Sequence, residues 1–134
     1  MSPRRVARFT IPGVPRPKGS RATGFTKSGK PYSRESNPRA SEWLKAAREF
    51  LGAEHSGEPL APPYRVTATF FFEKPKKPSH PFPSRGDCDK YCRNLLDALQ
   101  AGVLTNDSAV IELSAVKRWG EPRTEVLVEE VDGY

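Results

Sequence analysis

Fourteen prolines in 134 residues set the strongest limit on how this chain can fold. Proline fixes φ and lacks a backbone N–H donor, so it is disfavoured in helix interiors and in central strands. Two clusters of proline, at residues 12–17 and 75–83, therefore have to lie between regular elements. Because the hydrophobic fraction is only 36%, we expect one domain over residues 1–134, with a modest core and long connections.

Four segments have the composition of strands. Residues 8–11, 66–72, 110–119 and 124–131 are rich in β-branched and aromatic residues or alternate apolar with polar side chains. The second segment contains three consecutive phenylalanines, which predicts a central strand that is buried on both faces. The last two segments are separated by a short turn sequence and are predicted to pair as a hairpin.

Two helices are predicted between these strands. Asn37-Pro38 supplies a typical N-cap and first helical position, and Gly52 is the expected end of the helix that follows. Its apolar stripe, which includes Trp43, is predicted to face the core. Asp89 is the expected N-cap of a second helix over residues 90–100. The sequence therefore predicts an α/β (α+β) domain, with a mixed, largely antiparallel sheet and two main helices.

The two cysteines, Cys88 and Cys92, are too few for a disulfide framework. A zinc site would have to recruit His55 and His80, and that spacing fits no usual finger or knuckle. On a helix, Cys92 shares a face with leucines at 95, 96 and 99, which predicts a buried thiol in the core. The other, polar face of the same predicted helix is formed by Lys90, Arg93, Asn94 and Asp97.

The charge balance points to an acidic partner. The net charge is +6 and the sequence pI is about 9.5, which favours nucleic acid first and an anionic membrane surface second. The sequence contains no apolar run of about 18 residues, and the apolar stretch near Val6 is too short for a signal peptide. We therefore expect a cytoplasmic protein.

Two basic segments are candidates for contacts with phosphate. Residues 16–34 are predicted to form a mobile loop that is either a solvated linker or a phosphate-contacting arm. Residues 73–83 are either an ordered loop that leads to the acidic cluster or a flap that touches substrate. His80 in this loop is either incidental or a general base. The basic side chains proposed to contact DNA are Lys18, Arg21, Lys27, Lys30, Lys76 and Lys77.

Three carboxylates stand out in this basic chain. Asp87 and Asp89 precede the second predicted helix, and Asp107 follows it. In an extended segment the first two would point the same way, and a short helix could return the third to them. Such a set suits Mg²⁺ or Mn²⁺, which prefer oxygen ligands. Taken singly, Asp89 is a helix cap, Asp107 is a turn residue, and Arg93 with Asp97 is a surface ion pair.

The order of these residues resembles the signature of the RusA family of Holliday junction resolvases. That family's pattern is D-x-D-N-x-x-K-x-x-x-D-A-L, followed by D-D-x-x-V. The matching residues here are Asp87-Cys88-Asp89, Arg93, Asp97-Ala98-Leu99 and Asn106-Asp107-Ser108-Ala109-Val110. The opening of the chain is also similar, with a short strand, a proline turn, a basic stretch with Tyr32, and the Trp43 helix.

The resemblance implies a crossover junction endodeoxyribonuclease that acts in DNA recombination and repair. Such enzymes are small basic homodimers that use Mg²⁺, with Mn²⁺ as a substitute, and cut branched DNA with symmetric nicks. Many are encoded by phages or prophages and act in the host cytoplasm. The family's metal ligands fall on Asp87, Asp89 and Asp107. The alternative is a non-catalytic module that binds branched or double-stranded DNA.

The chain departs from the family pattern at three positions. Arg93 occupies the position of the catalytic lysine, Lys90 that of an asparagine, and Asn106 that of the first acid of the second cluster. Arg93 keeps the positive charge and can bind phosphate through two N–H groups, but it does not donate a proton at neutral pH. Lys90 is the candidate for the missing ammonium. The candidate catalytic residues are thus Asp87, Asp89, Asp107, Arg93 and Lys90.

Overall fold

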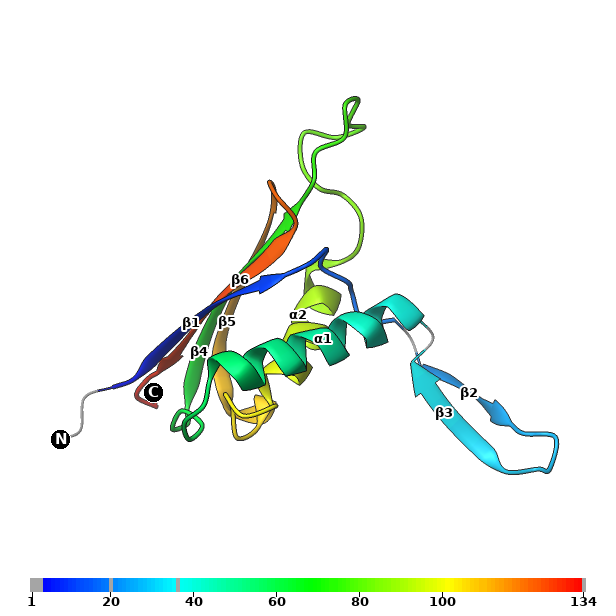
Figure 1. Ribbon diagram of the computed structural model, residues 1–134, viewed down its shortest axis with the longest axis horizontal. Helices are drawn as coiled ribbons and strands as arrows, with labels where there is room; N and C mark the ends of the chain where they lie inside the picture. The colour runs from blue at the N-terminus through cyan, green and yellow to red at the C-terminus, as the bar shows by residue number, and fades with distance from the viewer. Residues whose placement is uncertain (1–3, 20, 36, 134) are drawn as a thin grey trace.

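The computed structural model describes residues 4–19, 21–35 and 37–133, without the side chains of residues 21, 22 and 33–35. The content of helix and strand confirms the predicted α+β class (Figure 1). The regular elements are β1 (Val6–Pro12), β2 (Arg21–Phe25), β3 (Pro31–Glu35), α1 (Pro38–Glu54), β4 (Tyr64–Phe72), α2 (Cys88–Leu99), the 3₁₀ turn η1 (Asp107–Ala109), β5 (Val110–Trp119) and β6 (Arg123–Glu130).

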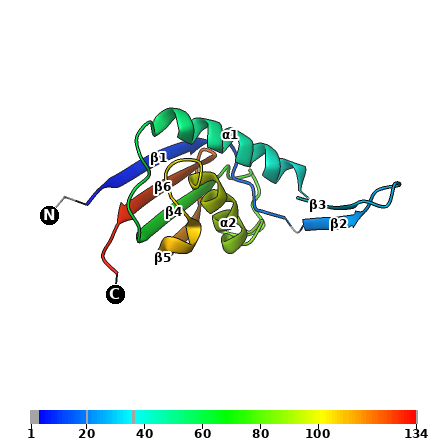
Figure 2. The ribbon, with the colours of Figure 1, turned by 90° about the horizontal axis from the view of Figure 1, so that it is seen from below.

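The main sheet has the strand order β1-β6-β4-β5. Only β4 and β5 run parallel, and the other neighbours are antiparallel, so the predicted mixed, largely antiparallel sheet is confirmed. The predicted central strand is β4, which lies between β6 and β5. Both helices cover one face of this sheet (Figures 1 and 2).

The prediction that β5 and β6 form a hairpin is wrong, because β4 lies between them. The connection at residues 120–122 crosses the end of β4, where the Gly120 N–H donates to the Phe72 carbonyl at 2.8 Å. Alternation in the sequence identifies a strand and its buried face, but it does not identify the neighbouring strand. Here β4 provides hydrogen-bonding partners for both segments.

The core lies between the sheet and the two helices. Alternate residues of β4 are buried there, and Trp43 and Leu51 of α1 pack in the same cluster. The predicted core roles of Trp43 and of Cys92 are both confirmed. Among the described residues, no packing layer covers the second face of β4, which corrects the prediction for the phenylalanine run. Phe70 is buried, whereas Phe71 is half-buried, with the Arg123 guanidinium 3.7 Å from its ring centroid.

Helix α1 begins as predicted, because the Asn37 side chain accepts a hydrogen bond from the Arg39 N–H at 3.0 Å. It does not end at Gly52. That glycine is exposed inside the helix, which continues to Glu54. An exposed helical glycine costs only about 1 kcal/mol relative to alanine, so the packed face of the helix outweighs it. No helix in the described part of the chain is long and apolar enough to cross a bilayer.

Helix α2 starts earlier than predicted, which also changes the role of Asp89. Asp87 is the N-cap residue in extended backbone conformation, and its carbonyl accepts the N–H groups of Lys90 and Tyr91. Asp89 therefore lies in the first helical turn and is not the cap. A carboxylate in the first turn is favoured by the helix dipole, which accounts for its place there.

The segment predicted to be a mobile loop contains a β-hairpin. Strands β2 and β3 pair antiparallel and project away from the body of the molecule (Figures 1 and 2). Their turn is closed by the Thr26 N–H, which donates to the Lys30 carbonyl at 2.8 Å, and Gly29 takes the positive φ of +85° that the turn needs. No strand was predicted here, because glycine, proline, alanine and glutamate, which strands disfavour, interrupt these segments.

Candidate functional site

Two of the predicted metal ligands project from the start of α2. The Asp87 side chain is 72% exposed and makes no capping hydrogen bond. Asp89 is exposed two residues further on, in the first turn of the helix. The Lys90 ammonium lies 4.0 Å from the Asp87 carboxylate across one turn. The Asp87 carboxylate oxygens are therefore open to solvent beside a cation.

The backbone before Asp87 is held from two sides. Gly86 has a φ of +73°, and a Cβ there would lie 2.5 Å from the Tyr91 hydroxyl oxygen. The Tyr91 hydroxyl donates to the Arg85 carbonyl at 3.0 Å, and the Lys117 ammonium donates to the Gly86 carbonyl at 2.8 Å. Burial raises the pKa of the Tyr91 phenol, although Arg16 and Arg85 act in the opposite direction. The phenol thus stays protonated and can donate.

Lys117 is a residue that the sequence analysis missed. It comes from β5, where its strand neighbour is Phe70 of β4. Its half-buried side chain reaches from the sheet to the loop that carries Asp87. One signal in the sequence could have found it. Lys117 alternates with Ala115 and Trp119 along the strand, so side-chain alternation places this charged residue on the face that the helices cover.

Asp107 lies beyond the other end of α2. It is the first residue of η1. Two residues earlier, the Thr105 N–H donates to the Tyr64 hydroxyl at 3.1 Å, and Tyr64 is the first residue of β4, at the opposite end of that strand from Phe72. The 12 residues of α2 span about 18 Å, so the helix separates Asp107 from the pair instead of returning it within one chain. Within residues 4–19, 21–35 and 37–133, no group of three or more carboxylate, imidazole or thiol side chains lies close enough to hold an ion.

The chemistry of the carboxylates nevertheless fits a hard divalent cation. Mg²⁺ needs only one or two carboxylates from the protein, because water and substrate phosphates supply the remaining oxygens. Asp87 and Asp89 are exposed and lie two residues apart at the start of α2, so they are able to provide that share. Cys92 does not compete as a ligand, because burial raises the pKa of its thiol to about 11.

A buried asparagine fixes the chain around α2. Helical spacing placed Asn94 on the polar face, but it is only 2% exposed. Its amide donates to the carbonyls of Arg16 and Ala40, both at 3.2 Å, and so joins α2 to α1 and to the β1–β2 connection. Asn94 is thus a structural residue on the helix that carries the candidate site.

Lys18 is engaged within the protein. Its backbone N–H donates to the Lys90 carbonyl at 3.1 Å, and its ammonium pairs with the Asp97 carboxylate. Asp97 therefore pairs with Lys18, and not with Arg93 as one interpretation of the sequence proposed. The first part of the segment predicted to be mobile is therefore docked on α2.

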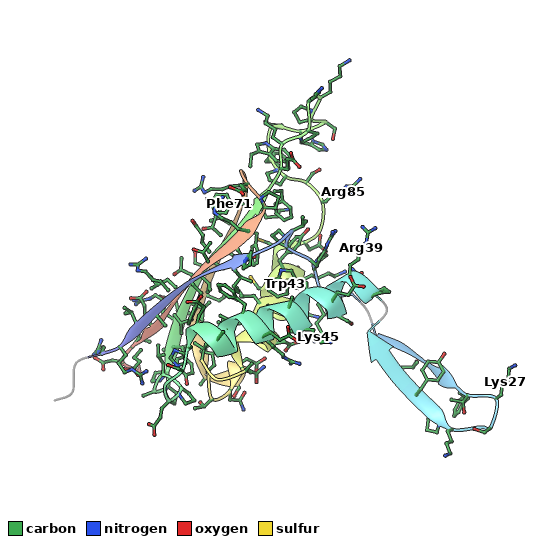
Figure 3. The ribbon with its side chains drawn as sticks, in the orientation of Figure 1. Lys27, Arg39, Trp43, Lys45, Phe71 and Arg85 are labelled. Atoms are coloured by element: carbon green, nitrogen blue, oxygen red, sulfur yellow. The ribbon has the colours of Figure 1, made fainter. Side chains whose placement is uncertain are left out.

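The remaining basic candidates lie on two projections. Lys27 and Lys30 are exposed at the turn of the β2–β3 hairpin, next to Phe25, which is 76% exposed (Figure 3). Lys76 and Lys77 are exposed in the loop between β4 and α2. The predicted contact at Arg21 lies outside the described side chains.

The loop between β4 and α2 is ordered at its base. The Trp119 indole N–H donates to the Pro81 carbonyl at 3.1 Å, and the bond from Lys117 to Gly86 ties the other end to β5. His80 is exposed and stacks on Phe82, with ring centroids 5.3 Å apart. The structure shows no hydrogen bond from His80 among the described residues, so its general-base role stays an untested hypothesis.

Exposed carboxylates beside cations, with basic projections on a chain of net charge +6, are typical of metal-dependent nucleases. The family model described as "Endodeoxyribonuclease RusA" matches residues 12–129. The chain therefore belongs to the RusA endodeoxyribonuclease family. It is also 27% identical to the uncharacterized protein YqaN of Bacillus subtilis (strain 168) over 139 aligned positions, which cover 92% of this chain and 96% of that protein.

Proposed function

We propose that the protein is a divalent-metal-dependent endonuclease that resolves Holliday junctions and cuts other branched DNA with paired, symmetric nicks. The observation that carries the proposal is the pair of exposed carboxylates at the start of α2 in a chain of the RusA family. A labelled four-way junction incubated with Mg²⁺ or with EDTA tests it. Cutting only with Mg²⁺ supports it, whereas binding without cutting would favour the non-catalytic module.

Each residue of the proposed site has a distinct task. Asp87 and Asp89, with Asp107, would hold Mg²⁺ or Mn²⁺, which supplies an activated water and neutralises charge on the scissile phosphate. Lys117 and Tyr91 fix the backbone that carries Asp87. Arg93 is exposed one helical turn after Asp89, where its guanidinium can bind the phosphate through two N–H groups.

The position of Asp107 supports a homodimer. Since α2 keeps it away from the other two aspartates, a second copy of the chain is the simplest source of the third carboxylate. A two-fold dimer also supplies two identical sites, as paired nicks require. Strand β5 is an edge strand of the sheet in the described part of the chain, and the exposed apolar side chains Ile111, Leu113 and Val116 make it the candidate interface.

Mixing two inactive variants should restore cutting if the site is shared between copies. We expect an equimolar mixture of Asp89→Asn and Asp107→Asn to regain about a quarter of the wild-type sites. About half of randomly paired dimers contain one chain of each variant, and one of the two sites in such a dimer is intact. Single-strand nicking of a labelled junction measures this. Sedimentation equilibrium should give about twice the chain mass of 14.9 kDa.

Differentially tagged chains provide the control for that mixture, since they show whether subunits exchange. If tagged chains do co-purify and the mixture remains inactive, all three carboxylates act within one chain. A strict monomer that still makes paired nicks would contradict the dimer itself.

Arg93 is expected to act on the reaction more than on binding. Arg93→Ala should lower the single-turnover cleavage rate about 100-fold through lost stabilisation of the phosphate, and junction affinity should change less than about threefold. Lys90→Ala should lower the rate less than about tenfold. Arg48→Ala, an equal change at an exposed position of α1, is the control. The reverse ranking of Arg93 and Lys90 would assign the family's lysine role to Lys90.

The β2–β3 hairpin is proposed to contact DNA phosphates. Each lost contact removes about 0.9 from the slope of log affinity against log salt. Lys27→Gln with Lys30→Gln should therefore flatten the slope by about two. Lys45→Gln with Arg48→Gln removes the same charge from exposed positions of α1 and should leave the slope unchanged. Equal slopes for both pairs of variants would show that the hairpin is a solvated extension.

A further inference from the structure

A cavity in the described part of the chain reaches Gly86, the residue that precedes Asp87. Its volume is about 610 Å³, within the usual range for a small-molecule site. Its wall combines three elements: the β1–β2 connection around Arg16, the loop from Glu73 to Gly86, and Trp119 at the end of β5. Because Gly86 belongs to the wall and precedes Asp87, one end of the cavity lies next to the backbone that carries the proposed cutting site.

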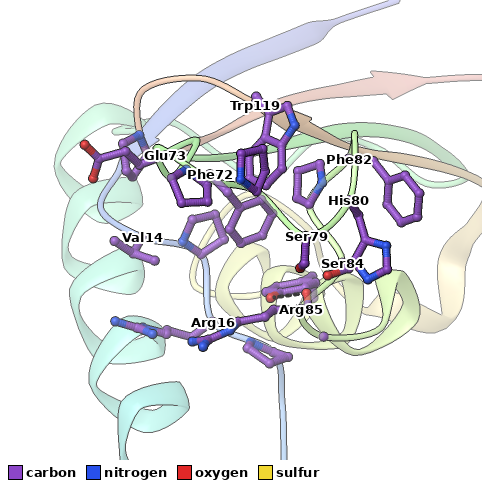
Figure 4. A pocket seen from close by; sticks show the side chains of 18 of the residues that line it. Val14, Arg16, Phe72, Glu73, Ser79, His80, Phe82, Ser84, Arg85 and Trp119 are labelled. Carbon is purple, nitrogen blue, oxygen red and sulfur yellow. Dashed lines mark hydrogen bonds between the residues drawn. The ribbon is translucent and has the colours of Figure 1, made fainter.

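The wall has the chemistry that an unpaired nucleotide requires. Flat apolar surfaces come from Phe72, Phe82 and Trp119, with His80 stacked on Phe82. Figure 4 shows Trp119 and Phe72 on one side of the cavity and Arg16 on the other. The fixed charges of the wall are three cations against one carboxylate, namely Arg16, Lys77 and Arg85 against Glu73.

Aromatic faces together with cations favour a nucleotide as the occupant of the cavity. Aromatic faces stack on any nucleobase, and guanidinium or ammonium groups bind the attached phosphates. An extruded base enters a protein pocket most readily where it is least stacked and paired in the free DNA, as at a branch point. The bonds from Trp119 to Pro81 and from Lys117 to Gly86 hold the wall in place before DNA binds.

We infer that this cavity receives one unpaired nucleotide of the branched DNA strand bound at Asp87, with its base against Phe82 and Trp119. The inference rests on the proposed function. It adds a base-binding site next to the cutting site, which makes the protein responsive to a nucleotide that the branch leaves free. Arg16 and Arg85 bind the phosphates on either side of that nucleotide.

A double-mutant cycle between protein and DNA tests the inference. Junctions carrying one abasic residue at each position near the branch are titrated with the wild-type chain in EDTA. We expect one position to weaken binding about tenfold through lost stacking. With Phe82→Leu, that same abasic position should change affinity less than twofold, whereas Phe82→Trp should keep the wild-type pattern. Phe82 is 54% exposed, so both variants are expected to fold.

Arg85→Gln gives a second readout, with Arg48→Gln as the matched control on α1. Arg85→Gln should weaken binding of the intact and abasic junctions alike, and Arg48→Gln should leave both unchanged. If the junction is bound and cut while the effect of every abasic position is the same in the wild-type chain and in Phe82→Leu, the cavity does not hold a base. In that case this inference fails while the proposed function stands. If the junction is not cut under any condition, the proposed function fails first.

Discussion

Replacement of Asp87, Asp89 or Asp107 by asparagine is expected to abolish cleavage of a four-way junction. Each change removes a ligand charge from the proposed cation site, and we expect the single-turnover rate to fall by at least about 100-fold. Binding of the junction should stay the same or become tighter, because the lost carboxylate also repelled the phosphates. Single-turnover cleavage in Mg²⁺ and mobility shift in EDTA measure the two effects separately.

Asp132→Asn is the matched control for these variants. Asp132 is an exposed aspartate that pairs with Arg4 and has no part in the proposed site. It should cut at the wild-type rate, since an exposed ion pair contributes at most about 1 kcal/mol. A change at Asp87, Asp89 or Asp107 that leaves the rate in Mg²⁺ unaltered would remove that residue from the ligand set.

The elements with strong local signals were predictable. The β-branched and aromatic composition of β4, the alternation in β6 and the Asn37-Pro38 start of α1 act between residues that are near in sequence. The neighbours of each strand were not predictable in the same way, because β5 and β6 both pair with β4 through contacts distant in sequence. The β2–β3 hairpin was missed because its residues have weak strand propensity.

The candidate site was also predictable only in part. The exposed positions of Asp87 and Asp89 follow from a loop that enters a helix, which the sequence shows. The distance of Asp107 depends on the direction of α2 relative to β4, which no local pattern reveals. Lys117 contacts the site only because β5 lies parallel to β4 and beside the loop that follows it. The metal-ligand roles of all three aspartates remain predictions.

Asn94 shows why helical periodicity misassigned a residue that matters for folding. Spacing along α2 placed it among charged side chains, where water would satisfy its amide. The β1–β2 connection instead docks over that side of the helix, held by the Lys18 N–H bond to the Lys90 carbonyl and by the ion pair of Lys18 with Asp97. Docking of a distant segment thus converts a polar helix position into a buried one.

Loss of the Asn94 amide is therefore expected to destabilise the whole domain. Asn94→Ala leaves the carbonyls of Arg16 and Ala40 without this buried donor, and each such group costs about 1–3 kcal/mol. We expect the free energy of unfolding in urea to fall by about 2–4 kcal/mol. Gln100→Ala, at the exposed end of the same helix, should change it by less than about 0.5 kcal/mol.

Asn94→Asp separates hydrogen bonding from packing, because it keeps the side-chain volume and replaces the donor by an acceptor. At pH 7 it places a carboxylate against two carbonyl oxygens, so it should destabilise the protein at least as much as Asn94→Ala. If Asn94→Asp instead retains wild-type stability, the amide bonds contribute little, and the contacts of Lys18 with Lys90 and Asp97 are what hold the β1–β2 connection beside the candidate site.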